Sequence, residues 1–288
     1  MLSEVSQVAN KSFESNVQLM TEQWNKLKED LYNGVVGYDD LSKLVSDYAF
    51  FRHFDNLFKE TMKHFEVNLL DIQAIHRGVS GEIALNNYER MIPKIEFAKG
   101  HNRMNPPGKA FLYAGILGED TDKDEKTIKK HVVKTVLKEI RATQDSKATI
   151  CKFKINEAAN NHKVINICGD NSIPKSNNGL VEYIYKHAIK NLTIDQNKIS
   201  YIMANVYFNM FSSDQIFKPI NTNDEEVKKY EYAPFHAIAN YIGQQGYAGL
   251  IFNSTVHQNG TNLVLFEPSD ASVIENSMEY INTSDYLL

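Results

Sequence analysis

The segment HNRMNPPGKAFLYAG, residues 101–115, places a cation and a phenol ten residues apart, Arg103 and Tyr113. Two prolines and a glycine separate them at 106–108. Proline lacks an amide donor and glycine adopts backbone angles that other residues avoid, so this stretch turns sharply and is neither a helix nor a regular strand. Such a turn lets Arg103 and Tyr113 face one cleft. A local cluster of cations there would be enough to bind an acidic small molecule.

Polar residues near the ends of predicted elements form the set from which a site can be built: Arg77, Arg103, Tyr113, Glu139 and Ser254. The phosphate-binding motifs GxxxxGK[ST] and GxGxxG are absent, so a P-loop enzyme or a Rossmann domain loses its main support. The zinc motif HExxH and the nucleophile motif GxSxG are absent as well. Because the nine histidines follow no metal-ligand pattern, we expect no metal.

Composition and charge limit the class of protein. With 42% hydrophobic and 23% charged residues, the 288-residue chain has the composition of a globular protein with a sizeable core. Its length fits one domain with extensions or two unequal domains. The net charge of −5 argues against a nucleic-acid partner, because phosphate binding depends on Lys and Arg.

Three features favour a cytoplasmic protein. The two cysteines, Cys151 and Cys168, lie in apolar segments without zinc-site spacing and are expected to be thiols in a reducing compartment. The N-terminus contains Glu4 and lacks the basic-then-apolar run of a signal peptide. No stretch approaches the roughly 18 apolar residues of a membrane span, so no membrane partner is expected.

A helical N-terminal extension is predicted over residues 1–66. Apolar residues recur at steps of three and four up to Leu31, glycines 34 and 37 end that helix, and a second helix runs from Leu41 to Phe65. The short connection makes the two helices antiparallel. We interpret their aromatic stripe as a packing face and not as a cofactor site. The helical pair is expected to be a packing extension, and an element for homodimerisation or for partner binding is the alternative.

The remaining residues, 67–288, are predicted to form one α+β domain with a mixed or antiparallel sheet, because short strands and helices follow one another without regular βαβ alternation. Strands are predicted at 71–78, 109–117, 148–155 and 162–168. Helices are predicted around 128–140 and 179–192, and 232–268 reads as a helix, a strand, a Gly-Asn-rich turn and a strand.

Three blocks of the sequence resemble, in the same order, the blocks of the RES domain family, which is named for an arginine, a glutamate and a serine. HNRMNPPGKAFLYAG is similar to the family's Gly-Arg-aromatic-Asn-Pro-x-Gly run and Leu-Tyr strand. TVLKEIRATQDSKATICKFKI, from residue 135, is similar to its Ala-x-x-Glu helix start and following strand. The third block, 232–268, contains GLIFNSTVHQNGTNLVLFEP, similar to Asp-Gly-Ile-x-Tyr-x-Ser followed by Asn-Leu-Val-x-Phe.

The resemblance places the family's arginine, tyrosine, glutamate and serine on Arg103, Tyr113, Glu139 and Ser254. Arg77 matches an arginine of the family's first strand. The sequence departs from the pattern at His101, Met104 and Ala248, and the spacing between the first two blocks is longer than in compact members. Glu119 is therefore a rival for the glutamate; we prefer Glu139, because a strand follows it as in the family.

Members of this family are similar to ADP-ribosyltransferases in fold and consume NAD+, often as the toxin of a toxin–antitoxin pair. The resemblance implies NAD+ as the substrate and an antitoxin or immunity protein that covers the cleft. It implies that Arg77, Arg103 and Tyr113 bind NAD+, with guanidinium groups on the phosphate oxygens and the phenol ring on the nicotinamide. Glu139 would stabilise the positive charge that develops on the ribose, and Ser254 would orient that carboxylate or a ribose hydroxyl.

The sequence leaves the acceptor of the ADP-ribose open. Water would make the protein a glycohydrolase, phosphate a phosphorylase and a macromolecule an ADP-ribosyltransferase. A non-catalytic binding module is the alternative from another class, and the presence of all four polar residues argues against it.

Overall fold

The computed structural model describes residues 18–19, 21–118, 124–170, 172–174, 177–190, 193–211, 220 and 222–287. The chain packs into two compact units. The first, here called the helical unit, combines Met1–Phe65 with Ile167–Ala237. The second, the sheet unit, combines Glu66–Asn166 with Ile238–Leu288.

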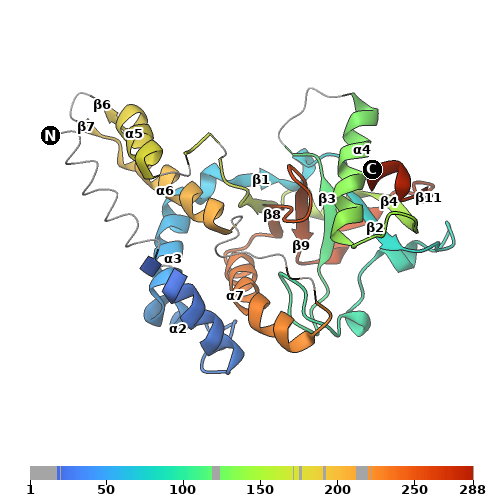
Figure 1. The fold of residues 1–288 in the computed structure, drawn as a ribbon, viewed down its shortest axis with the longest axis horizontal. Helices are drawn as coiled ribbons and strands as arrows, with labels where there is room; N and C mark the ends of the chain where they lie inside the picture. Colours follow the sequence, from blue (N-terminus) through green and yellow to red (C-terminus); the bar gives the residue numbers. More distant parts are fainter. Residues whose placement is uncertain are drawn as a thin grey trace. The chain divides into compact units, whose positions relative to one another are not determined.

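The sheet unit is built on a nine-stranded sheet with the order β1-β5-β8-β9-β3-β2-β4-β10, in which β11 also pairs with β4. Only β5 and β8 run parallel, and the other pairs are antiparallel, so the predicted α+β class with a mixed sheet is confirmed (Figure 1). The strands are β1 (Glu66–Asn68), β2 (His76–Ser80), β3 (Leu112–Ile116), β4 (Lys147–Ile155), β5 (Lys163–Asn166), β8 (Gly249–Asn253), β9 (Thr261–Leu265), β10 (Ala271–Val273) and β11 (Glu279–Asn282).

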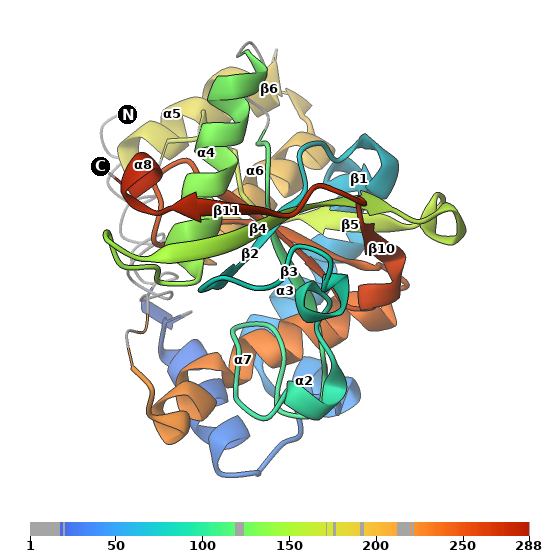
Figure 2. The same ribbon diagram turned by 90° about the vertical axis from the view of Figure 1, so that its right-hand side faces the viewer.

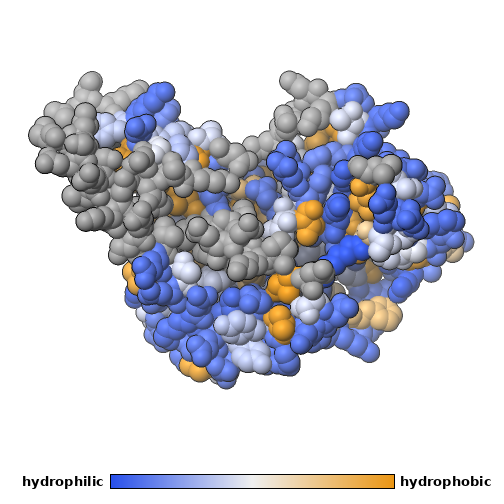
Figure 3. Space-filling view, in the orientation of Figure 1, coloured by the Kyte–Doolittle hydropathy of each residue, from blue (hydrophilic) through white to orange (hydrophobic). Residues whose placement is uncertain are grey.

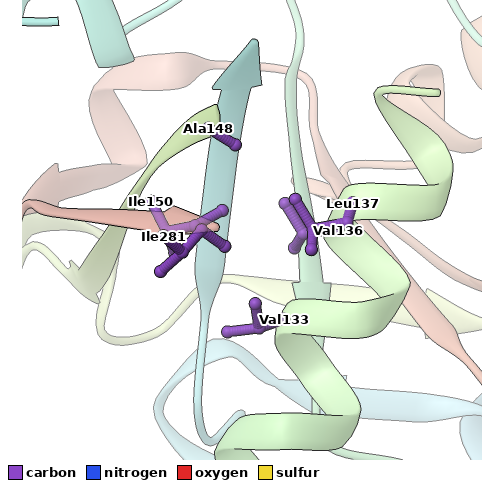
Figure 4. Packing of buried hydrophobic residues seen from close by; sticks show 6 residues of the cluster. All are labelled: Val133, Val136, Leu137, Ala148, Ile150 and Ile281. Atoms are coloured by element: carbon purple, nitrogen blue, oxygen red, sulfur yellow. The ribbon is translucent and has the colours of Figure 1, made fainter. Parts of the chain in front are cut away.

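Helix α4 (Glu125–Glu139) packs on strands β2, β3 and β9 of this sheet (Figure 2). Its buried face contributes Val133, Val136 and Leu137 to a cluster with Ile150 and other apolar residues of β4 and β11, so the helix is fixed by apolar burial (Figure 4). A glycine on β3 permits close contact, because a Cβ at Gly115 would lie 2.8 Å from Val136 Cγ2. This packing fixes where the C-terminal end of α4 meets the sheet.

The helical unit has an aromatic core. Residues 21–32 form a helix in which Trp24 is fully buried, and its ring lies edge-on to Phe50 and Phe235 at centroid distances of 4.9 and 5.1 Å. Trp24, Phe51, Phe54 and Phe58 of the N-terminal stripe are buried, so within the described residues the predicted packing face is confirmed. Phe13, Val17 and Met20 lie outside the described residues. The other helices of this unit are α2 (Leu41–Asp47), α3 (Ala49–Thr61), α5 (Asn177–Ala188), α6 (Gln196–Phe211) and the first part of α7 (Glu225–Gln244).

The second N-terminal helix is interrupted where the sequence predicts a continuous one. Tyr48 separates α2 from α3 with an extended backbone, φ −112° and ψ 113°, and its hydroxyl donates to Asp30 Oδ2 over 2.7 Å. The spacing of apolar residues along the chain cannot predict a tertiary hydrogen bond of this kind. The strand predicted at 71–78 is also displaced, since β2 starts at His76 and continues to Ser80.

The division at Phe65 and Glu66 lies beside the predicted boundary between 1–66 and 67–288. The structure groups 167–237 with the N-terminal helices by packing, a discontinuity that no sequence pattern predicts. Packing does not test the extent of the catalytic domain, so the range 67–288 stays a prediction.

Among the coloured residues in Figure 3, most are hydrophilic, and the hydrophobic ones occur in small groups. Of the helices in the described ranges, none is both long and apolar enough to cross a membrane. Cys151 is buried on β4 and Cys168 is half-buried; both are thiols and not disulfide partners, as predicted.

Candidate active site

A carboxylate held by two neutral donors forms the centre of the candidate site. Glu139, the last residue of α4, accepts hydrogen bonds on Oε1 from Ser254 Oγ at 2.7 Å and from Asn262 Nδ2 at 2.6 Å. Ser254 directly follows β8, and the buried Asn262 lies on β9. Both bonds use the same oxygen, so they fix the plane of the carboxylate while engaging only one of its two oxygens. The structure thus brings together the predicted Glu139 and Ser254.

The β8–β9 loop, residues 254–260, is organised around Ser254. Its hydroxyl accepts from the backbone amides of Val256 and His257 at 3.3 and 3.1 Å while it donates to Glu139. Its backbone amide donates to Gly260 O over 2.7 Å, which closes the loop. A hydroxyl that is used as donor and acceptor at once has a defined orientation.

Arg103 is anchored to the same loop. Its Nη2 donates to Thr255 Oγ1 over 2.8 Å, and its guanidinium lies 5.5 Å from the ring centroid of Phe252 on β8, within the range of a cation–π interaction. Thr255 is the next residue after Ser254, and consecutive Cα atoms are about 3.8 Å apart. Neighbouring residues of one loop therefore hold the arginine and the carboxylate.

Tyr113, on β3, holds the turn that carries Arg103. The tyrosine hydroxyl donates to Asn105 Oδ1 over 2.7 Å and accepts from the amide of Met104 over 2.9 Å. The buried Asn105 in turn donates to Lys109 O over 2.6 Å. The sequence predicted the turn but not this use of the phenol. The ring is half-buried, and its stacking on nicotinamide stays a prediction.

Arg77 lies on β2 opposite Cys151 and is connected to Tyr113 through the backbone, since its Nη1 donates to Tyr113 O over 2.9 Å. Desolvation lowers the pKa of this guanidinium from its usual value, although Cys151 and Tyr113 oppose that effect. Its buried Nε has no hydrogen-bond partner among the described residues. Burial has the opposite effect on the pKa of the neighbouring thiol of Cys151, which it raises to about 12. Binding of a ligand by Arg77 stays a prediction.

Sequence reasoning missed three residues that complete these contacts: Asn105, Thr255 and Asn262. Each belongs to one of the quoted blocks, and Asn262 is the asparagine of the Asn-Leu-Val-x-Phe pattern. The rival glutamate, Glu119, lies outside the described residues. Within the described part of the chain, no three His, Cys, Asp or Glu side chains gather as a metal site would require.

A family model covers the strand and loop that carry these contacts. Residues 211–284 match the RES domain. The match confirms the predicted resemblance to the RES domain, and it contains the third sequence block with Ser254 and Asn262. The blocks with Arg103 and Glu139 precede the matched RES residues and are joined to them by the hydrogen bonds described above. Comparison with curated proteins and comparison with solved structures gave no match.

Proposed function

We propose that this protein is an NAD+-consuming enzyme that cleaves the bond between nicotinamide and ribose. The observation that carries the proposal is the attachment of Glu139 and Arg103 to adjacent residues, Ser254 and Thr255, of one loop in the RES-matched region. NAD+ presents a pyrophosphate and a cationic nicotinamide glycoside. A guanidinium and a carboxylate in one site complement these two charges.

The proposed step breaks the bond between ribose C1′ and the nicotinamide nitrogen, and nicotinamide leaves with the bonding electron pair as a neutral molecule. The ribose then carries oxocarbenium-like positive charge, which the Glu139 carboxylate stabilises. Ser254 and Asn262 bind one carboxylate oxygen and keep the other in a fixed direction. When water adds to C1′, a new C–O bond forms and a proton is released.

Arg103 is proposed to bind the pyrophosphate, because a guanidinium donates to phosphate oxygens through a planar fork. Its bond to Thr255 through Nη2 holds the guanidinium on the same loop that binds Glu139, as a substrate with both a pyrophosphate and a cationic glycoside would require. Tyr113 supports the turn that carries Arg103. Arg77, which is hydrogen-bonded to the backbone of Tyr113, is proposed as a second contact to NAD+.

The RES match also supports a role as a toxin that depletes cellular NAD+ and is restrained by an antitoxin or immunity protein. Phosphate as acceptor would give a phosphorylase. Transfer of the ADP-ribose to a macromolecule is the second candidate, because it uses the same donor site and differs in what reaches C1′.

The test is incubation of the purified full chain with NAD+ while free nicotinamide is measured, in buffer alone, with phosphate and with cell extract. We expect nicotinamide release in buffer or with phosphate. Release only with extract, with labelled ADP-ribose on macromolecules, would establish transfer. NAD+ binding without release under all three conditions would establish a non-catalytic module and refute the proposal.

A further inference from the structure

The β8–β9 loop is fastened to α4 by a second set of contacts besides the bond between Ser254 and Glu139. His257 Nδ1 lies 2.8 Å from Thr135 Oγ1, and His131 Nε2 lies 3.0 Å from Asn259 O. Thr135 and His131 precede Glu139 on α4 by four and eight residues, which is about one and two helical turns. The contacts therefore follow the α4 face that leads to the carboxylate.

The loop approaches the helix closely at this point. A Cβ at Gly260 would lie 2.8 Å from Thr135 Oγ1 and 3.0 Å from His257 Nδ1, so only glycine fits there without displacement. Thr135 is fully buried, and its hydroxyl also lies 3.1 Å from His131 O. If that hydroxyl donates to His131 O, the hydrogen of the imidazole is on Nδ1 and points to Thr135 Oγ1.

His257 is also hydrogen-bonded directly to Ser254. The backbone amide of His257 donates to Ser254 Oγ over 3.1 Å, and His257 O accepts from the amide of Gly260 over 2.9 Å. Gly260 O accepts from the amide of Ser254 over 2.7 Å. A displacement of His257 therefore shifts both ends of the loop and the hydroxyl that binds Glu139.

We propose that His257, through its contact with Thr135, is a positioning residue that holds the β8–β9 loop so that Ser254 stays on Glu139 and Thr255 stays on Arg103. The inference rests on the proposed function for its effect on turnover, whereas its effect on the loop does not. The groups that face His257 are His131, Lys134, Lys138 and Glu139 of α4. Burial, followed by the effect of His131, lowers the pKa of His257 to about 4, so the ring that makes the contact is neutral near pH 7.

Two substitutions of Thr135 separate the effect of its hydroxyl from the effect of its side-chain volume. Thr135→Val keeps a branched side chain of similar volume and removes the hydroxyl, and Thr135→Ser keeps the hydroxyl. In the full-length protein we expect Thr135→Val to increase amide hydrogen exchange in peptides covering 254–260. We expect it to lower kcat/KM for NAD+ on the order of ten- to a hundredfold, because small displacements of catalytic groups are costly. Thr135→Ser should stay close to the unmodified protein in both measurements.

His257→Gln, on a half-buried loop position, gives the same test if Thr135→Val does not fold, and His162→Gln on another loop is its control. Unchanged exchange over 254–260 in the folded variant would overturn the inference, as would increased exchange with unchanged NAD+ turnover. If the unmodified protein does not consume NAD+ but Thr135→Val still increases exchange, the proposed function is refuted and the positioning of the loop is supported.

Discussion

At the residue scale, the candidate site depends on one carboxylate whose partners are neutral. Ser254 and Asn262 donate to Glu139 without bringing a positive charge to it, which suits the proposed stabilisation of a cationic transition state. Two of the contacts of Arg103 are of another kind, with the hydroxyl of Thr255 and the aromatic face of Phe252.

Glu139→Gln removes the charge and keeps the size of the side chain. We expect kcat for NAD+ to fall on the order of 10² to 10³, with a smaller effect on KM, because electrostatic stabilisation acts mainly in the transition state. Nicotinamide release measures the effect, and Glu82→Gln, on an exposed glutamate that pairs with Lys147, is the control. Full activity of Glu139→Gln together with an inactive Glu119→Gln would transfer the role to Glu119.

Arg103→Ala should have its main effect on KM, because a phosphate contact stabilises the bound substrate as well as the transition state. The measurement is a full saturation curve with NAD+. Arg103→Lys is the informative companion, since it keeps the charge and loses the planar fork. An unchanged KM in Arg103→Ala would exclude the proposed phosphate contact.

The lowered pKa of His257 predicts that the stability of the fold depends on pH. Its folded pKa, about 4, is below the ordinary value of about 6.5, so the folded state resists protonation. The neutral His257 ring therefore contributes its full share to the stability of the folded state above pH ~6.5, and this contribution is lost as the pH falls from there towards about 4. We expect His257→Gln to show a smaller decrease in Tm between pH 7.5 and pH 5 than the unmodified protein. An identical decrease in both proteins would contradict the assignment.

At the element scale, the position of Glu139 follows from the close packing of α4 on the sheet. Gly78 and Gly115 leave room for the side chain of Val136. A side chain at either glycine would occupy that space. The loop on the other side of Glu139 uses Gly260 in the same way, against Thr135. The helix is therefore held between strands and loop by contacts so close that an additional methyl group at these glycines would displace a neighbouring side chain.

Gly115→Ala adds a Cβ 2.8 Å from Val136 Cγ2 and 3.2 Å from the backbone oxygen of Val132. We expect this overpacking to lower the free energy of unfolding by about 1–3 kcal/mol, measured by denaturant titration. Gly243→Ala, in α7, is the matched control because its Cβ would meet Phe266 at 3.4 Å, an ordinary contact. A loss of stability in the control equal to that of Gly115→Ala would show that packing at α4 is not the cause.

At the scale of the whole molecule, two stretches distant in sequence share one aromatic core. Trp24 and Phe50 come from the N-terminal segment, whereas Phe235 and Tyr207 come from the segment that follows β5. The N-terminal helices are therefore part of a folded unit and not an appendage that packs on itself alone.

Trp24→Ala tests this shared core. We expect it to lower the free energy of unfolding by about 3–5 kcal/mol, because it removes a fully buried indole and leaves a cavity. Leu19→Ala, at a side chain that is 45% exposed, is the control and should have little effect. A small loss of stability in Trp24→Ala would mean that the two stretches do not depend on each other.

The sequence by itself determined the α+β class, the sharp turn after Arg103, a helix around 128–140 and the likeness to the RES domain, because each is encoded by local pattern or by ordered motifs. That Glu139 is the last residue of this helix, and not near the start of one as in the family's Ala-x-x-Glu pattern, came from the structure. The resemblance also predicted that Ser254 and Glu139 lie together, and in the structure their side chains are hydrogen-bonded. Only the tertiary structure decided that Asn262 shares the carboxylate and that Thr255 binds Arg103. It alone joined 167–237 to the N-terminal helices. Hydrogen bonds and apolar contacts between residues more than a hundred positions apart depend on how the strands and helices pack, and no periodicity along the chain records that packing.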